Sequence, residues 1–458
     1  MALGQRYHLV GIGGSGMSGL ASILLAQGRE ISGSDLKWSP EAERLSGLGV
    51  PVRVGHDGGC ISPDLDGVII SSAISSDNAE VVAAREKHVP VVRRLHAVAS
   101  LLEEYSSIGV VGSHGKSTTT AMIATLLRAL GFSPSYLIGA YCPNLGGNAH
   151  LGGGEWFVAE VDESDGLFTE IRPTIAVLTN IGRDHLQTYR SEEAIRQAFR
   201  QYVLQAGRAV LSIDDVHVRA IAADVPDAIT VGLSADADLR ARDVRHERFR
   251  TSFELSYRGE SLGRRSITAP GTHNVLNALC ALGAAVAAGA DPAAAADALV
   301  AISLPHRRFE VLEENGVTVV DDFAHTPEEV EATLRAIREG WSGRRIVAVF
   351  QPHRYTRTLS MGRDFGRAFS GADVVIVTNI YSACERAVPG VSAAGIVDAV
   401  LETTDSLVYF IPDKDDVVAH LKALIRPGDF IISVGAGDIW TVTEELANFL
   451  KEGSFCIA

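Results

Sequence analysis

The sequence predicts an α/β protein of three domains whose sheets are mostly parallel. Short runs of β-branched residues alternate with helical segments along the chain, which is typical of parallel strands joined by helices. The length of 458 residues corresponds to about three domains of common size. Glycine-rich and charged motifs follow several predicted strands, at the positions where open α/β sheets bind their ligands.

Two stretches mark the expected domain boundaries, one near residue 106 and one near residue 305, because each separates a helix from a new strand–helix series. We therefore expect an N-terminal Rossmann-like domain over residues 1–106 and a central P-loop ATPase-type α/β domain over residues 107–305. A C-terminal Rossmann-like domain with a parallel sheet is expected over residues 306–458.

The elements of the first two domains are predicted from apolar runs and from the turns that separate them. The predicted strands are residues 7–11, 67–71, 108–111, 156–161 and 174–179, and the predicted helices are residues 18–27, 79–87 and 117–130. Residues 237–265 are polar, alternating and rich in arginine, so we interpret them as surface β-structure of the central domain.

The C-terminal third shows the alternation most clearly. Five apolar runs, each followed by a helical segment, are interpreted as buried parallel strands. These runs are residues 317–321, 345–350, 373–378, 407–411 and 429–434.

Charge and cysteine content limit the partners. Lys and Arg number 41 and Asp and Glu number 56, and this net charge of −15 argues against nucleic acid and anionic membranes as partners. The five scattered cysteines form no CxxC pair and indicate reduced thiols of a cytoplasmic protein. Residues 9–26 carry no charge, but their five glycines favour a strand, a loop and a helix over a membrane span.

The first motif follows the first predicted strand and fits the G-x-G-x-x-G pattern. Its backbone N–H groups can approach a pyrophosphate at the start of a helix, and Asp35, 19 residues after Gly16, can hold a ribose hydroxyl. The pattern indicates a dinucleotide or a nucleotide diphosphate without choosing between them, and a tight turn needed only for packing is the alternative. The candidate residues are Gly11, Gly13, Gly14, Ser15 and Gly16.

The second motif, GSHGKST, lies between a predicted strand and a helix and is similar to a P-loop. In a P-loop, backbone amides surround the phosphates, the lysine binds the β- and γ-phosphates, and a hydroxyl binds Mg²⁺. Val110 stands at the first glycine position of the strict pattern, and a chance match at a helix start is the alternative. The candidate residues are Gly112, Ser113, His114, Gly115, Lys116, Ser117 and Thr118.

Charged motifs follow four further strands. Residues 160–165 hold four carboxylates, which suit Mg²⁺ unless they form a solvated acidic turn. Residues 179–185 end in His185, whose imidazole can bind a metal or orient a carboxylate, and a structural or surface histidine is the alternative. Residues 321–327 and 351–357 follow C-terminal strands, and Arg354 and Arg357 in the latter can bind a carboxylate or can be solvated charges.

Eight motifs together resemble the Mur ligase family, the ATP-dependent amide-forming ligases of peptidoglycan precursor synthesis. In chain order they are GIGGSGM, GSHGKSTTT, AEVDESD, TNIGRDH, GTHNVLNA, HRRFE, DDFAHTP and FQPHRYTRT. The first and the last are most similar to the branch that uses L-alanine. Phe323 and Thr326 depart from that branch, where a tyrosine and a second histidine are usual.

The resemblance implies that the N-terminal domain binds a UDP-sugar, that the central domain binds ATP, and that the C-terminal domain contacts the amino acid and ATP. The UDP part would be held by the first glycine loop and Asp35, together with Ser71, Ser72 and Arg94. Lys116 would reach the γ-phosphate of ATP, and Mg²⁺ would be served by Ser117, Glu160 and His185.

The resemblance also implies roles for later residues. Asn274 and Asn277 would lie near the adenine, and Arg308 and Asp322 would reach ATP. The amino acid would face His325, His353, Arg354 and Arg357. The residues implied to take part in catalysis are Lys116, Glu160, His185, His325 and Arg354.

The implied reaction joins L-alanine to the lactyl carboxylate of UDP-N-acetylmuramate. ATP phosphorylates the carboxylate, the amine of L-alanine attacks the acyl phosphate, and ADP and phosphate are released. The partners would be these small molecules, and the chain would be a monomer or a dimer. The alternatives are a recycling ligase that adds a whole tripeptide to the same nucleotide, a nucleotide-sugar-binding protein without turnover, and a nicotinamide-dependent oxidoreductase.

Overall fold

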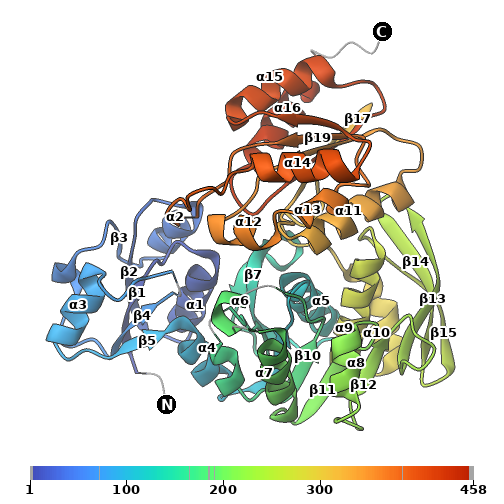
Figure 1. Cartoon of the computed structure of the whole chain (residues 1–458). Coiled ribbons are helices and arrows are strands. Elements are labelled where there is room, and N and C mark those ends of the chain that lie inside the picture. Colours follow the sequence, from blue (N-terminus) through green and yellow to red (C-terminus); the bar gives the residue numbers. More distant parts are fainter. Residues whose placement is uncertain are drawn as a thin grey trace. The chain divides into compact units, whose positions relative to one another are not determined.

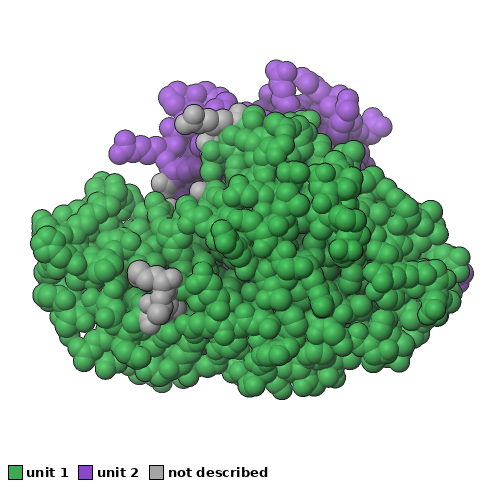
Figure 2. Space-filling model, turned by 90° about the horizontal axis from the view of Figure 1, so that it is seen from below, with its two compact units in different colours: residues 1–243, 253–267, 276–305 green, residues 244–252, 268–275, 306–458 purple. Residues whose placement is uncertain are grey.

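The structure is a computed structural model that describes residues 4–71, 73–164, 166–183, 186–189, 191–383 and 385–452 (Figure 1). It contains three sheets, of five, ten and six strands, which confirms the predicted α/β class. The chain divides into two compact units (Figure 2). Unit 1 comprises Met1–Asp243, Phe253–Ile267 and Leu276–Pro305, and unit 2 comprises Val244–Ser252, Thr268–Val275 and His306–Ala458.

The N-terminal sheet has the order β3-β2-β1-β4-β5, and all its neighbouring strands are parallel. This arrangement confirms the Rossmann-like prediction. The strands are β1 Arg6–Val10, β2 Glu30–Asp35, β3 Val52–Val54, β4 Gly67–Ile70 and β5 Val91–Arg93. The helices are α1 Ser15–Ala26, α2 Pro40–Gly47, α3 Ala79–Glu86 and α4 Arg94–Leu102.

The central sheet has the order β15-β14-β13-β12-β11-β10-β6-β9-β7-β8. Its strands from β12 to β7 are parallel neighbours, and β8 pairs with β7 in the antiparallel direction. The strands are β6 Ser106–Val111, β7 Ser135–Cys142, β8 Gly147–His150, β9 Trp156–Glu160, β10 Ile175–Leu178, β11 Arg208–Ser212, β12 Ile229–Gly232, β13 Leu239–Glu247, β14 Arg250–Tyr257 and β15 Glu260–Ile267. The helices are α5 Lys116–Ala129, α6 Leu186–Tyr189, α7 Glu192–Leu204, α8 Val216–Ala222, α9 Thr272–Ala287 and α10 Pro292–Asp297.

The C-terminal sheet has the order β16-β17-β21-β18-β19-β20, and its strands are parallel except β16, which is antiparallel to β17. The strands are β16 Glu310–Asn315, β17 Val317–Asp322, β18 Ile346–Phe350, β19 Val374–Val377, β20 Leu407–Phe410 and β21 Phe430–Val434. The helices are α11 Pro327–Gly340, α12 Tyr355–Met361, α13 Phe365–Ala368, α14 Ala394–Thr403, α15 Lys414–Leu424 and α16 Trp440–Lys451.

Two predicted elements need correction. Helix α1 begins at Ser15, three residues before the predicted start, because Gly14 is extended and Ser15–Gly16 already take part in the first turn. The run 407–411 was predicted as a buried strand, but β20 is the edge of its sheet, and Leu407 and Phe410 are exposed. The composition of residues 407–411 is as apolar as that of a central strand, so the sequence alone could not show that β20 lies at the edge of its sheet.

The core explains how the first two sheets are held together. One cluster of buried apolar side chains extends from β1 and α1 in the N-terminal sheet to β9 and β10 in the central sheet. Leu20, Leu101 and Phe157 are completely buried members of this cluster. The C-terminal sheet has a separate core that includes Val347, Ile431 and Leu446.

Within the described part of the chain, no helix is long and apolar enough to cross a membrane.

Candidate active site

The first glycine loop is folded against the end of β2. The carbonyl of Ser34 accepts hydrogen bonds from the N–H groups of Gly11 and Ile12, at 2.8 and 3.0 Å. The carboxylate of Asp35 accepts one from the N–H of Gly13 at 2.9 Å. Gly11 has a φ of 81°, a left-handed conformation that glycine adopts without strain. Asp35, predicted to hold a ribose, therefore also braces the loop.

The start of α1 is a positively polarised site next to an arginine. Gly14 caps the helix without a side-chain hydrogen bond, and its first turn contains no acidic residue, so the helix dipole is not neutralised locally. The guanidinium of Arg94 lies so close to Gly16 that a Cβ there would be 2.9 Å from Nη1. Free helix N–H groups beside a guanidinium can bind a diphosphate.

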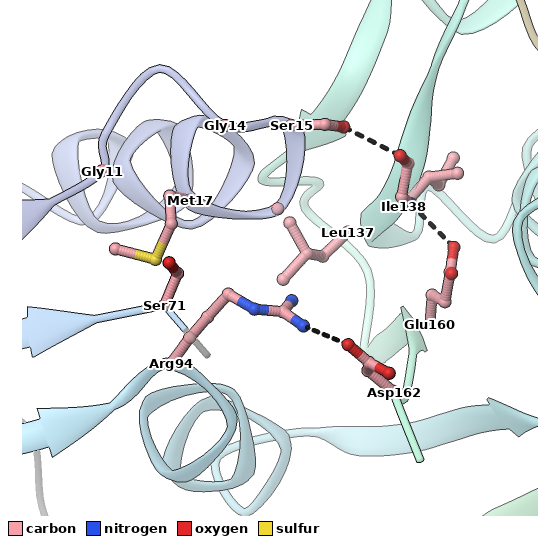
Figure 3. A pocket seen from close by; sticks show the side chains of 12 residues that line it. Gly11, Gly14, Ser15, Met17, Ser71, Arg94, Leu137, Ile138, Glu160 and Asp162 are labelled. Carbon is pink, nitrogen blue, oxygen red and sulfur yellow. Dashed lines mark hydrogen bonds and ion pairs between the residues drawn. The ribbon is translucent and has the colours of Figure 1, made fainter. Parts of the chain in front are cut away.

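A pocket of about 280 Å³ opens at this helix start and contains groups from both the N-terminal and the central sheet (Figure 3). It brings together the predicted Gly11, Gly14, Ser15, Gly16, Ser71, Arg94 and Glu160. Met17, Leu137, Ile138 and Gly139 also line it and were not predicted as site residues, and Asp162 of the predicted acidic motif lines it as well. Ser72 lies outside the described residues.

The second loop connects β6 to α5 and is held by the residues that follow β10. The side chain of Asn180 accepts a hydrogen bond from the N–H of His114 at 2.9 Å and donates one to its carbonyl at 3.0 Å. The hydroxyl of Ser113 accepts a bond from the N–H of Gly182 at 2.7 Å. Asn180 thus fixes the loop, although the sequence predicted only His185 from this motif.

Glycine is required at the start of this loop. Gly112 has a φ of 143°, and a Cβ there would lie 2.1 Å from the hydroxyl of Thr179. The carbonyl of His114 accepts a hydrogen bond from the same hydroxyl at 2.7 Å. The backbone of the loop is therefore packed directly against residues 179–182, which leaves its other face for phosphates.

Lys116 is held at the mouth of the loop by a buried carboxylate. Its Nζ donates to the carbonyl of Gly112 at 2.7 Å and to Glu163 at 2.9 Å. Burial would lower the pKa of Lys116, but Glu163, Glu160 and Asp162 together raise it, so the ammonium stays charged. Burial raises the pKa of Glu163 to about 7, although Lys116 lowers it. The sequence did not predict that this acidic run is partly buried.

The end of β9 brings oxygen ligands close to the loop. Glu160 is in register with Val110 of β6, the strand that leads into the loop, and its Oε2 accepts a hydrogen bond from the N–H of Gly139 at 2.8 Å. Ser117 lies in the first turn of α5. Carboxylate and hydroxyl oxygens are the ligands that Mg²⁺ prefers, so these residues fit a magnesium ion completed by phosphate oxygens and water.

The side chains that the structure describes do not form a metal cage on their own. Among the described residues, no group of three or more His, Cys, Asp or Glu side chains could hold a metal ion. His185, the third predicted ligand, lies outside these residues.

The two predicted adenine-binding residues fall into different compact units. Asn277, in unit 1, is buried and close to the second loop: a Cβ on Gly115 would lie 2.5 Å from its Oδ1. Asn274, in unit 2, is also buried and donates to the carbonyl of Pro270 at 2.8 Å. Their adenine-binding role stays a prediction.

In unit 2, Asp322 is buried at the end of β17. Its carboxylate accepts hydrogen bonds from the N–H groups of Phe309 and Ala324, at 2.7 and 2.8 Å. Burial raises the pKa of Asp322 to about 6, although Arg308 lowers it. The guanidinium of Arg308 lies 4.8 Å from the ring centre of Phe323. The ring of Phe323 therefore packs against Arg308, the arginine predicted to contact ATP.

The predicted amino-acid-binding residues gather at the ends of β17 and β18. The ring centres of His325 and His353 are 5.9 Å apart, and His353 stacks on Tyr381 at 5.6 Å. Arg357 Nη1 lies 3.2 Å from Nδ1 of His353. Arg354 has a φ of 72° and caps α12, and its Nε is buried with no hydrogen-bond partner among the described residues.

Comparisons with known proteins agree across the chain. Residues 6–106 match the Mur ligase family catalytic domain, residues 110–285 the Mur ligase middle domain, and residues 307–437 the Mur ligase glutamate ligase domain. A curated UDP-N-acetylmuramate–L-alanine ligase from Pelobacter propionicus is 43% identical over 456 residues, which cover 98% of this chain and 99% of the relative.

Solved structures agree with the family models. The crystal structure of a UDP-N-acetylmuramate-alanine ligase from Thermotoga maritima is 29% identical with a TM-score of 0.85 and covers 98% of this chain and 100% of its own. A murein peptide ligase from Psychrobacter arcticus shares the fold, with 23% identity, a TM-score of 0.70 and coverage of 98% and 99%. On its sequence and its three-domain architecture, the chain belongs to the Mur ligase family.

Proposed function

We propose that the chain joins L-alanine to the lactyl carboxylate of UDP-N-acetylmuramate at the expense of ATP. The observation that carries this proposal is the pocket that contains both the start of α1 and the end of β9 (Figure 3). A nucleotide diphosphate bound by α1 and Arg94 would extend toward Glu160, next to the strand that leads into the phosphate loop. The curated relatives that carry the alanine ligase name support this substrate pair.

The residues of the second loop suit the activation step. A carboxylate is a poor electrophile, and transfer of a phosphoryl group to it creates a leaving group for the amine. Lys116 and the N–H groups at the start of α5 would stabilise the charge that moves between the phosphates and the carboxylate. The three N–H donors of Lys116 contact Gly112, Ser113 and Glu163, so one of these bonds would be exchanged for a bond to the γ-phosphate.

We propose Ser117, Glu160 and His185 as the residues that hold Mg²⁺. Bound there, the ion would neutralise phosphate charge and polarise the transferred group. Glu160 accepts a hydrogen bond from the N–H of Gly139 at 2.8 Å, and Asp162 is paired with Arg94 at 3.4 Å. The carboxylate of Glu160 would therefore bind the metal, while that of Asp162 would pair with Arg94.

We propose that the amino acid binds at the ends of β17 and β18. The main handle of L-alanine is its α-carboxylate, and Arg354 Nε is buried without a hydrogen-bond partner among the described residues. His325, His353 and Arg357 would complete this site.

We also propose the cytoplasm as the location, because Cys142 and Cys280 are buried free thiols, as expected of a reducing compartment.

The nucleotide preference of the first loop provides the test. We expect UDP to displace UDP-N-acetylmuramate in competition binding, and NAD and NADP to leave it bound, because the pocket continues into the central sheet at Glu160 and Asp162. Isothermal titration with each nucleotide would measure this. Tight NAD binding that competes with UDP would contradict the ligase proposal and favour an oxidoreductase.

A further inference from the structure

Gly139 lines the pocket, and its backbone contacts residues of both the N-terminal and the central sheet regions. Strand β7 is paired with β9 as far as Leu137 and Ala159. Beyond that pair, the N–H of Gly139 donates to Glu160 Oε2 at 2.8 Å, and its carbonyl accepts from the hydroxyl of Ser15 at 2.8 Å. The two backbone polar groups of Gly139 therefore contact both the carboxylate proposed for the metal and the first residue of α1.

Helix α1 also packs closely against the hairpin that is formed by β7 and β8. Asn148, on β8, donates to the carbonyl of Ser15 at 2.7 Å. A Cβ on Gly19 would lie 2.6 Å from a methyl of Leu137, so the helix and β7 are in direct contact. The start of α1 and the backbone of Gly139 are consequently packed together, so a shift of one is expected to move the other.

Position 139 requires glycine because of the neighbouring Glu160 carboxylate and not because of its backbone conformation. Gly139 is exposed and does not adopt the left-handed conformation, so alanine would be tolerated by its backbone. A Cβ there, however, would lie 2.5 Å from Oε2 and 2.8 Å from Oε1 of Glu160. An added methyl group would therefore displace the carboxylate from its hydrogen bond.

We propose that Gly139 is a positioning residue, which orients Glu160 for a metal–nucleotide complex and links this carboxylate to the start of α1. The inference rests on the proposed function, because that function assigns the metal to Glu160. Carboxylates that bind metals are generally oriented by a hydrogen bond from a neighbouring group, and loss of such a bond costs about 10- to 100-fold in metal affinity. The link to α1 further implies that a UDP-sugar and the metal strengthen each other's binding.

The test is the affinity of the full chain for Mn²⁺ in the presence of ADP, measured by electron paramagnetic resonance. Mn²⁺ prefers the same oxygen ligands as Mg²⁺ and gives a signal that does not depend on turnover. We expect Gly139→Ala to raise the Kd for Mn²⁺ by about 10- to 100-fold, and to leave the binding of metal-free ADP unchanged. A merely structural role would change both affinities.

The same hairpin offers a matched control. Gly147, on β8, has no left-handed φ, and the nearest atom to a Cβ there is 3.8 Å away. Gly147→Ala is expected to change the Kd for Mn²⁺ by less than about twofold. Ser15→Ala, which removes the hydroxyl that donates to the Gly139 carbonyl, is expected to reduce the gain in Mn²⁺ affinity that UDP-N-acetylmuramate produces at concentrations shown by titration to saturate the variant.

Equal Mn²⁺ affinity in wild-type and folded Gly139→Ala chains would overturn the proposal, as would an equal loss in both glycine variants. If Gly139→Ala does not fold, an unchanged UDP-sugar effect in Ser15→Ala overturns it instead. If Gly139→Ala loses Mn²⁺ affinity as expected but the wild-type chain forms no product with L-alanine, the inference is supported and the proposed function is contradicted. The two failures are therefore distinguishable.

Discussion

Lys116→Met is expected to lower kcat by roughly 10²- to 10³-fold, because one preorganised donor to the transferred phosphate is lost, at a cost of about 3–4 kcal/mol in barrier. UDP-N-acetylmuramate should still bind, since its proposed site lies at α1 and Arg94 and contains no part of Lys116. Phosphate release and calorimetric titration would measure the two effects separately. Near-normal turnover would remove the phosphate-loop interpretation.

The buried partner of Lys116 complicates this variant in a predictable way. Without the ammonium, Glu163 loses the group that lowers its pKa, and its folded-state pKa rises further above the ordinary value. A buried acid with a raised pKa binds more protons when folded, so the stability of the variant should fall as pH rises from about 4.5 through that pKa. Lys116→Met combined with Glu163→Gln removes this titration and preserves the test of the lysine.

A second lysine serves as the control for the substitution itself. Lys422, on α15, forms a partly exposed ion pair with Glu445 at 3.6 Å. Such pairs contribute little, so Lys422→Met should leave kcat within about twofold of the wild-type value. A large loss in this variant would show that methionine substitutions harm the fold generally.

Arg354→Ala is expected to raise the KM for L-alanine by roughly 10- to 100-fold, because a hydrogen bond to a charged group contributes about 1.5–3 kcal/mol. The KM for UDP-N-acetylmuramate should change much less. The same substitution at Arg357 is expected to act in the same range, and partly through His353, which its guanidinium contacts at 3.2 Å. Initial rates at varied alanine concentration would measure both variants.

Lysine and a neighbouring arginine test the chemistry of this site. Arg354→Lys should recover only part of the affinity, since an ammonium lacks the planar fork that matches a carboxylate. Arg363 is exposed, nine residues further along the chain, and Arg363→Ala should leave both KM values unchanged. If Arg354→Ala instead weakens ATP or UDP-sugar binding, the arginine contacts a phosphate or the lactyl carboxylate.

The fold and the loops could be predicted because their signals are local. The glycine loops of residues 11–14 and 112–115 directly precede helices α1 and α5, and Asp35 lies at the end of β2 beside the first loop. Parallel sheets bring the ends of consecutive strands to one edge, so motifs after strands mark a common site. The alternation of strands and helices likewise predicted three sheets without any knowledge of their order.

The contacts that complete the site could not be predicted, because they join residues far apart in the sequence. Nothing near Asn180 in the sequence indicates that its side chain accepts a hydrogen bond from the N–H of His114 and donates one to its carbonyl. The acidic run gave no sign that Glu163 is buried against Lys116, 47 residues earlier. Gly139 belongs to no motif, and its role follows only from the position of Glu160 beside it.

Release of phosphate from ATP tests the central claim most directly. The purified chain would be given ATP, Mg²⁺ and UDP-N-acetylmuramate with each of the twenty amino acids, and separately with the tripeptide that a recycling ligase would add. We predict phosphate release and a UDP-N-acetylmuramoyl-alanine product, seen by mass spectrometry, with L-alanine as the best acceptor. Turnover with the tripeptide and none with L-alanine, or no phosphate release with any acceptor, would contradict the account.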